Sequence, residues 1–246
     1  MLESFKRLFA GRAEEPQPWS DVAAWAAQRS LNFRRVREGE GFVVEGRLDE
    51  QPWRMEWGPP QRSYIAGREL RIRMELKLPS ELQMLLLSKR LMEQLERQTY
   101  DSFTEGLQTQ IDTGTPEEMR WLVMFPKANL NMFRVLRSHF GAVAPGAGTV
   151  LSWLEGPLGL HLERALGTLL VNDPPFVLMT LRGRAYLRLQ LLDPDPASLD
   201  SVLGIFESAI GQARRVASQL GEGEHQDWPS TGGSTAWQSF DDTKPR

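Results

Sequence analysis

Metal binding and acid–base chemistry near neutral pH depend most often on histidine and cysteine, and this chain has few of either. It contains three histidines, His139, His161 and His225, and no cysteine. His161 begins the tripeptide HLE, which matches the H-x-E of zinc deaminases, but those enzymes also need a P-C-x-x-C that this chain lacks. No second ligand lies within helical reach of His161, so we interpret it as an ordinary helix residue. The sequence predicts no metal site and no cofactor.

A glycine-rich segment, GAVAPGAGT at residues 141–149, contains the beginning of a phosphate-binding loop. Gly141 and Gly146 have the required spacing, but Ala147 and Gly148 stand where a lysine and a serine or threonine should follow. Without the lysine, no side-chain charge would meet the β- and γ-phosphates, so we interpret the segment as a linker. The chain also lacks the G-x-S-x-G of a nucleophilic serine. No motif in it predicts an enzyme.

The eight tryptophans are better candidates for a binding role. Trp53 and Trp57 share one face of a predicted strand, and Trp25 belongs to a predicted helix. One interpretation is that these rings fill a core above the sheet. The other is that they line a pocket between the sheet and a long helix, which would hold an apolar ligand. Trp25, Trp53 and Trp57 are therefore candidate ligand or partner contacts.

The N-terminal segment, residues 1–15, is amphipathic, with Leu2, Phe5 and Phe9 on one helical face. Helices shorter than about 12 residues are marginal in water, so this segment needs a surface on which to dock. Nearby acidic residues offset its basic ones, and no lipidation signal is present. We expect it to dock on protein, within the chain or across a subunit contact. Peripheral membrane contact is the alternative.

The composition, 41% hydrophobic and 25% charged, is that of an ordinary soluble globular protein. A net charge of −3 provides no overall attraction to nucleic acid. The sequence has no secretory signal and no apolar run of roughly 18 residues, so we expect no integral membrane segment. The lack of cysteine fits a reducing compartment. These observations predict a cytoplasmic protein without nucleic-acid partners.

The hydrophobic periodicity predicts an α+β fold. Apolar and polar residues alternate in residues 42–48, 53–57 and 70–78, as in antiparallel strands with one buried face. Residues 176–191 are predicted to form a hairpin. Helical spacing predicts helices near residues 20–28, 79–107, 127–140, 151–170 and 196–220, with Asp195 as the N-cap of the last. We expect an antiparallel β-sheet, a meander in the N-terminal half and a hairpin in the C-terminal half, packed against long α-helices.

The predicted organisation has five parts along the chain. They are the N-terminal segment 1–15, an α+β part 16–140, the glycine-rich linker 141–149, a C-terminal part 150–221 and a disordered tail 222–246. The order of helices and strands resembles that of the bacterial secretion-chaperone-like fold, in which a small α+β domain binds partner chains through non-covalent contacts.

This resemblance and the lack of catalytic motifs lead to one functional expectation. We expect a non-enzymatic interaction protein, an adaptor or chaperone-like module, that binds a protein partner or associates with itself. The alternative is a carrier of a small apolar ligand that uses the tryptophan-lined pocket.

Overall fold

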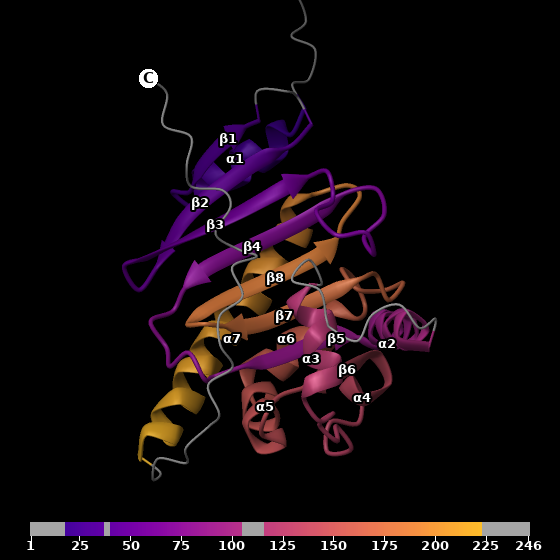
Figure 1. Ribbon diagram of the computed structural model, residues 1–246. Helices are drawn as coiled ribbons and strands as arrows, with labels where there is room; N and C mark the ends of the chain where they lie inside the picture. The colour runs from indigo at the N-terminus through magenta and orange to yellow at the C-terminus, as the bar shows by residue number, and fades with distance from the viewer. Residues whose placement is uncertain (1–17, 37–39, 105–115, 223–246) are drawn as a thin grey trace, which may run out of the picture.

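A single antiparallel sheet organises the computed structural model, which describes residues 18–36, 40–104 and 116–222 (Figure 1). In spatial order its eight strands are β1 (Asn32–Arg35), β2 (Phe42–Leu48), β3 (Gln51–Gly58), β4 (Glu69–Glu75), β8 (Arg184–Gln190), β7 (Phe176–Leu181), β5 (Met84–Ser88) and β6 (Phe140–Val143). The predicted α+β class, with its N-terminal meander and C-terminal hairpin, is confirmed. The hairpin lies inside the sheet, because β8 pairs with β4 and β7 pairs with β5.

Helices cover both faces of the sheet. They are α1 (Ser20–Gln28), α2 (Lys89–Thr104), α3 (Glu117–Met124), α4 (Leu136–His139), α5 (Ala147–Leu154), α6 (Pro157–Ala165) and α7 (Pro196–Glu222). The helices α1, α5, α6 and α7 pack on one face and enclose the larger core. The helices α2 and α3 pack on the opposite face, over the end of the sheet that contains β7, β5 and β6 (Figure 1).

The long helix α7 has both the N-cap residue and the buried apolar face that its sequence predicts. Asp195 Oδ1 accepts hydrogen bonds from the backbone N–H groups of Ala197 (2.9 Å) and Ser198 (3.1 Å), as an N-cap residue should. The apolar stripe that follows, which includes Phe206 and Ile210, is buried in the larger core. Both the start and the buried face of this helix follow from its sequence.

The helix predicted from residue 79 is wrong in its first part. Residues 84–88, MLLLS, form strand β5, and all five are buried. A strand that is covered on both faces has no polar side, so its sequence is a continuous apolar run that fits a helix equally well. The helix begins only at Lys89.

Other predicted helices are shorter or divided. The helix expected over residues 127–140 is reduced to α4 and is followed directly by β6. The one expected over 151–170 is two helices, α5 and α6, separated at Gly156, whose φ of 67° interrupts helical geometry.

The segment 141–149, predicted as a linker, instead contributes to strand β6 and helix α5. Gly141 packs closely against Met92, because a Cβ atom at this position would overlap Sδ and Cε of Met92 unless that side chain moved. Strands from before and after this segment pair within one sheet. The predicted N-terminal segment with Leu2, Phe5 and Phe9, and the predicted tail from residue 223 onward, lie outside the described residues.

Candidate functional site

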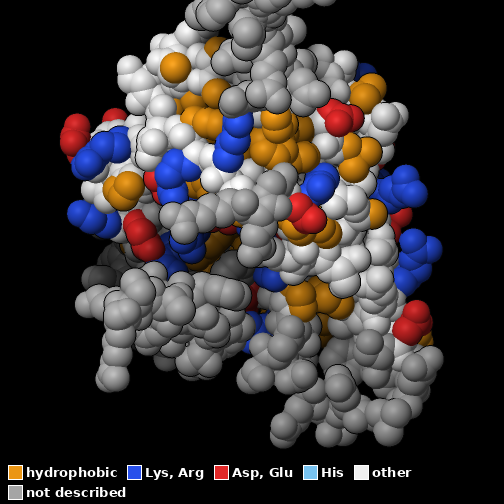
Figure 2. All heavy atoms as spheres, turned by 90° about the horizontal axis from the view of Figure 1, so that it is seen from above, with side chains coloured by type: hydrophobic (Ala, Val, Ile, Leu, Met, Phe, Trp, Pro, Cys, Tyr) orange, Lys and Arg blue, Asp and Glu red, His pale blue; other side chains and the backbone are white. Residues whose placement is uncertain are grey.

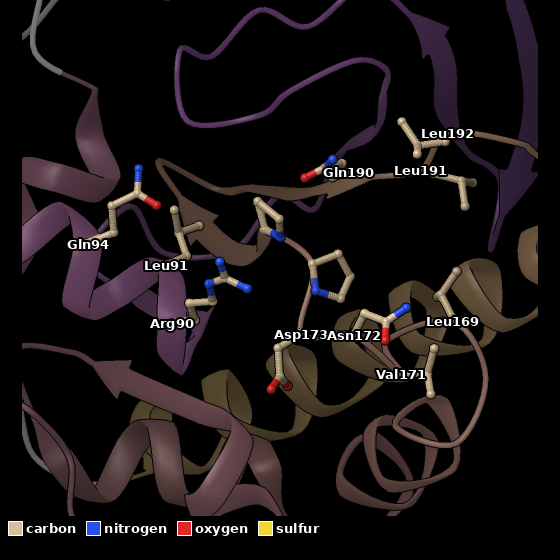
Figure 3. Close-up of a pocket in the computed structure, with 12 residues that line it drawn as sticks. Arg90, Leu91, Gln94, Leu169, Val171, Asn172, Asp173, Gln190, Leu191 and Leu192 are labelled. Atoms are coloured by element: carbon tan, nitrogen blue, oxygen red, sulfur yellow. The ribbon is translucent and has the colours of Figure 1, made fainter.

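The candidate site is a pocket of about 500 Å³ beside the start of α2 (Figure 3). Three segments enclose it: the first turns of α2, the connection between α6 and β7, and the residues at the end of β8. The lining residues are Arg90, Leu91, Gln94, Leu169, Val171, Asn172, Asp173, Pro174, Pro175, Gln190, Leu191 and Leu192. We call this the α2–β8 pocket.

The wall between α6 and β7 is held in place by its backbone. Two consecutive prolines, Pro174 and Pro175, fix φ and provide no N–H donors, so this stretch neither continues a helix nor extends the sheet. The carbonyl of Pro175 accepts the backbone N–H of Gln190 at 2.9 Å, which ties the connection to the end of β8. The pocket is therefore built on the adjacent ends of two inner strands, β7 and β8, and on the start of a helix.

Apolar side chains dominate the lining and are unusually exposed at two positions. Leu91 is buried beneath the pocket, whereas Val171 is 61% exposed and Leu192 is 56% exposed. Single exposed apolar residues are common on soluble proteins, but two of them on the rim of one pocket mark a surface suited to contact.

The charge of the α2–β8 pocket comes from Arg90. Its guanidinium makes no ion pair and no hydrogen bond with any residue that the structure describes, and its side chain extends from α2 into the pocket (Figure 3). Asp173, the acidic residue of the lining, is paired with His139, whose Nδ1 lies 2.9 Å from Asp173 Oδ1. The first turn of α2 contains no acidic residue, and the helix dipole adds positive potential there. The lining therefore contains one arginine and one aspartate, and no ion pair joins the two side chains.

The three predicted tryptophans lie elsewhere, in the larger core. Trp25, Trp53 and Trp57 are all buried, and none of them lines the α2–β8 pocket. The indole N–H of Trp25 donates to Asp200 Oδ1 at 2.8 Å, so that ring joins α1 to α7. Their location agrees with the interpretation that they fill a core above the sheet.

Trp57 nevertheless supports the pocket from behind. Its ring stacks on Phe42, with 5.6 Å between the ring centroids. Its indole N–H donates to the backbone carbonyl of Leu191 at 2.7 Å, and Leu191 is part of the pocket lining. Trp57 therefore positions one wall of the pocket without touching its interior.

A second polar feature crosses the sheet face that α3 partly covers. Ion pairs run from Glu45 through Arg54 and Glu56 to Arg71, and Glu69 pairs with Arg188 under full burial. The side chains of Glu69 and Arg188 are both enclosed, whereas those of Glu45, Arg54, Glu56 and Arg71 are partly exposed. Glu69 and Arg188 carry opposite charges that compensate each other, so we interpret this buried ion pair as a structural one that stabilises the sheet.

The same network fixes α3 through a buried carboxylate. Glu118 receives a hydrogen bond from Arg62 Nε at 2.7 Å and another from the hydroxyl of Tyr64 at 2.5 Å. Burial raises the pKa of Glu118, but the charge of Arg62 and the hydrogen bond from Tyr64 outweigh it and hold that pKa below its ordinary value. Glu118 is therefore an ionised anchor between α3 and the loop after β3.

The exposed edge of the sheet at β1 is a less suitable contact surface. β1 pairs only with β2 among the described strands. Ion pairs flank this end, with Arg34 on Glu45 and Arg29 on Asp200. Seen from this end, hydrophobic side chains are interrupted by charged ones (Figure 2). Charged edges of this kind oppose the addition of another strand.

The described residues contain neither a metal-binding cluster nor a membrane-spanning helix. No group of three or more His, Cys, Asp or Glu residues there could hold a metal ion. No helix among the described residues is both long enough and apolar enough to span a membrane.

Comparison with known proteins adds little. No family model and no curated protein matches the chain. A solved structure, the mycobacterial trehalose monomycolate transport factor A, is similar with 9% identity and a TM-score of 0.41, over 79% of this chain and 93% of that one. A likeness of that degree supports no conclusion about this chain.

The residues that form the pocket are absent from the sequence-based candidates. Arg90, Val171 and Leu192 come from three separate segments, and the strand β5 that brings α2 to this place is itself predicted as helix. One local signal is present: the apolar run LLV at 169–171 is followed directly by NDPP, which places apolar residues in a connection rather than in a helix or strand.

Proposed function

We propose that the protein is a non-enzymatic interaction module, an adaptor or chaperone-like protein, that binds a segment of a protein partner in the α2–β8 pocket. The supporting observation is the apolar pocket with Val171 and Leu192 exposed at its rim. A few residues that insert into well-packed, desolvated pockets supply most of the binding energy of protein interfaces. The partner is a different protein or a second copy of this chain, and the absence of cysteine suits a cytoplasmic setting.

A carrier of a small apolar ligand is the rival function. The volume of about 500 Å³ falls within the roughly 300–1,000 Å³ that small-molecule pockets occupy. In that case the ligand would occupy the α2–β8 pocket rather than a space lined by Trp25, Trp53 and Trp57, since those rings are packed in the core.

Site-specific photo-crosslinking in the cells from which the chain comes tests the proposal. The photoreactive residue p-benzoylphenylalanine replaces Val171 in one variant and Met132 in a control, which is 60% exposed and does not line the pocket. We expect a discrete protein adduct from position 171 that Leu192→Asp abolishes, and none of that mass from position 132. An adduct of twice the chain mass would identify self-association.

Two results would contradict the proposal. The first is the same set of adducts from both positions, which would show unspecific contact. The second is no protein adduct at position 171 together with a low-mass molecule retained by the purified protein in native mass spectrometry. That second result would support the carrier.

A further inference from the structure

We infer that the segment recognised by the α2–β8 pocket presents a carboxylate beside an apolar side chain, and that Arg90 is the counter-ion of that carboxylate. This inference rests on the proposed function and names the chemistry of the partner segment.

The guanidinium of Arg90 supports an anionic ligand. Among the residues that the structure describes, none pairs with the Arg90 guanidinium. The carboxylate of Asp173 lies within the lining but is already engaged by His139. No described residue of the lining therefore forms an ion pair with Arg90, and the carboxylate of a ligand could form one.

The number of cations favours a carboxylate over a phosphate. Arg90 is the single lysine or arginine among the twelve lining residues. A phosphate monoester carries a charge of about −1.5 to −2 and is usually met by several cations. A carboxylate carries one charge, and its two oxygens match the planar fork of a guanidinium. The amides of Gln94 and Asn172 are further hydrogen-bonding groups in the same lining.

The arrangement of the lining also gives the ligand a direction. Arg90 extends from α2 on one side, while Val171, Leu191 and Leu192 lie across the pocket from it (Figure 3). A ligand with its charge toward α2 and its apolar part toward the end of β8 satisfies both sides. An acidic residue or a chain terminus next to a leucine-like side chain has this form.

A matched pair of peptides tests the inference directly. N-acetyl-leucyl-leucine has a free carboxylate, and N-acetyl-leucyl-leucinamide differs only in carrying an amide there. Each is titrated into the full chain while the methyl resonances of Val171 and Leu192 and the Nε resonance of Arg90 are followed by NMR. We expect the carboxylate form to bind about three- to tenfold more tightly, as a charge-assisted contact at a partly exposed site should.

Two variants separate the role of Arg90 from general charge. Arg90→Gln should abolish the preference for the carboxylate and leave the affinity for the amide unchanged. Arg35→Gln removes another exposed arginine, which lies on β1 outside the pocket, and should preserve the preference. Equal binding of the two peptides, or a preference that survives Arg90→Gln, would overturn the inference.

The outcomes of this test and of the crosslinking are distinguishable. A carboxylate preference that depends on Arg90, with no protein adduct at position 171, refutes the protein partner and retains the chemistry of the site. A specific adduct with no carboxylate preference refutes this inference alone.

Discussion

Replacing Arg62 with methionine would leave the carboxylate of Glu118 buried without its cation. In the native chain the side chain of Glu118 is 1% exposed and that of Arg62 is 18% exposed. Removing one partner of a buried ion pair typically costs about 3–5 kcal/mol, because the remaining charge stays desolvated. Some water reaches Arg62, and Tyr64 still donates to Glu118, so we expect a loss of about 3 kcal/mol in the free energy of unfolding.

Urea denaturation of the native chain, of Arg62→Met and of a double variant measures this loss in the free energy of unfolding. The double variant Arg62→Met/Glu118→Gln removes the buried charge while an amide oxygen can still accept the hydrogen bond from Tyr64. We expect the double variant to be more stable than Arg62→Met alone. The reasoning is refuted if Arg62→Met costs less than about 1 kcal/mol, or if the double variant is no more stable than the single one.

The pH dependence provides an independent check with a definite sign. In the native chain the lowered pKa of Glu118 stabilises the fold fully above the unfolded pKa of about 4.3, and this contribution is lost as the pH falls through the folded pKa. In Arg62→Met, we expect burial to dominate and to raise the pKa of Glu118 above the unfolded value, because the charge of Arg62 no longer opposes it. The penalty in that variant is therefore present near pH 7 and shrinks as the pH falls toward the unfolded pKa. A penalty independent of pH would contradict this account.

Two further substitutions test the packing around the site. Trp57→Phe keeps a ring but removes the donor to the Leu191 carbonyl, so it should cost about 1 kcal/mol by thermal or urea melting and weaken peptide binding in the pocket; unchanged binding would show that Trp57 does not position the wall. Gly141→Ala should destabilise by roughly 1–3 kcal/mol, because its new methyl group overlaps Met92. Its control, Gly148→Ala, has nothing within 4 Å and lies in α5, so it should stabilise by about 0.5–1 kcal/mol; equal shifts in the two melting curves would refute the packing argument.

The parts of the fold predictable from sequence are those with one solvent-facing side. β4 alternates because Leu70 and Ile72 face the core while Arg71 faces the ion-pair network. α7 has one apolar stripe and a side-chain cap at Asp195. In each, the exposed side leaves a periodic polar signal in the sequence.

Two physical reasons explain why other parts of the structure were not predicted. Some elements are buried on both sides, and the pocket is assembled from segments that are distant in the sequence. β5 is covered on both faces, so its apolar run carries no period that distinguishes a strand from a helix. Gly141 packs against the side chain of Met92. In the sequence, such a glycine cannot be distinguished from a glycine of a flexible linker. The α2–β8 pocket combines Arg90 with Val171 and Leu192, and nothing local to any of the three indicates that they meet.

The measurement that tests the central claim most directly is the yield of the position-171 crosslink when the charge of the pocket is reversed. Arg90→Glu and Arg35→Glu change the net charge equally, but only the first lies in the α2–β8 pocket. We predict that Arg90→Glu reduces the yield of the partner adduct at least about tenfold, because like charges would face each other across the contact, and that Arg35→Glu leaves it unchanged. An equal yield from the two variants would contradict the claim that this pocket binds the partner through Arg90.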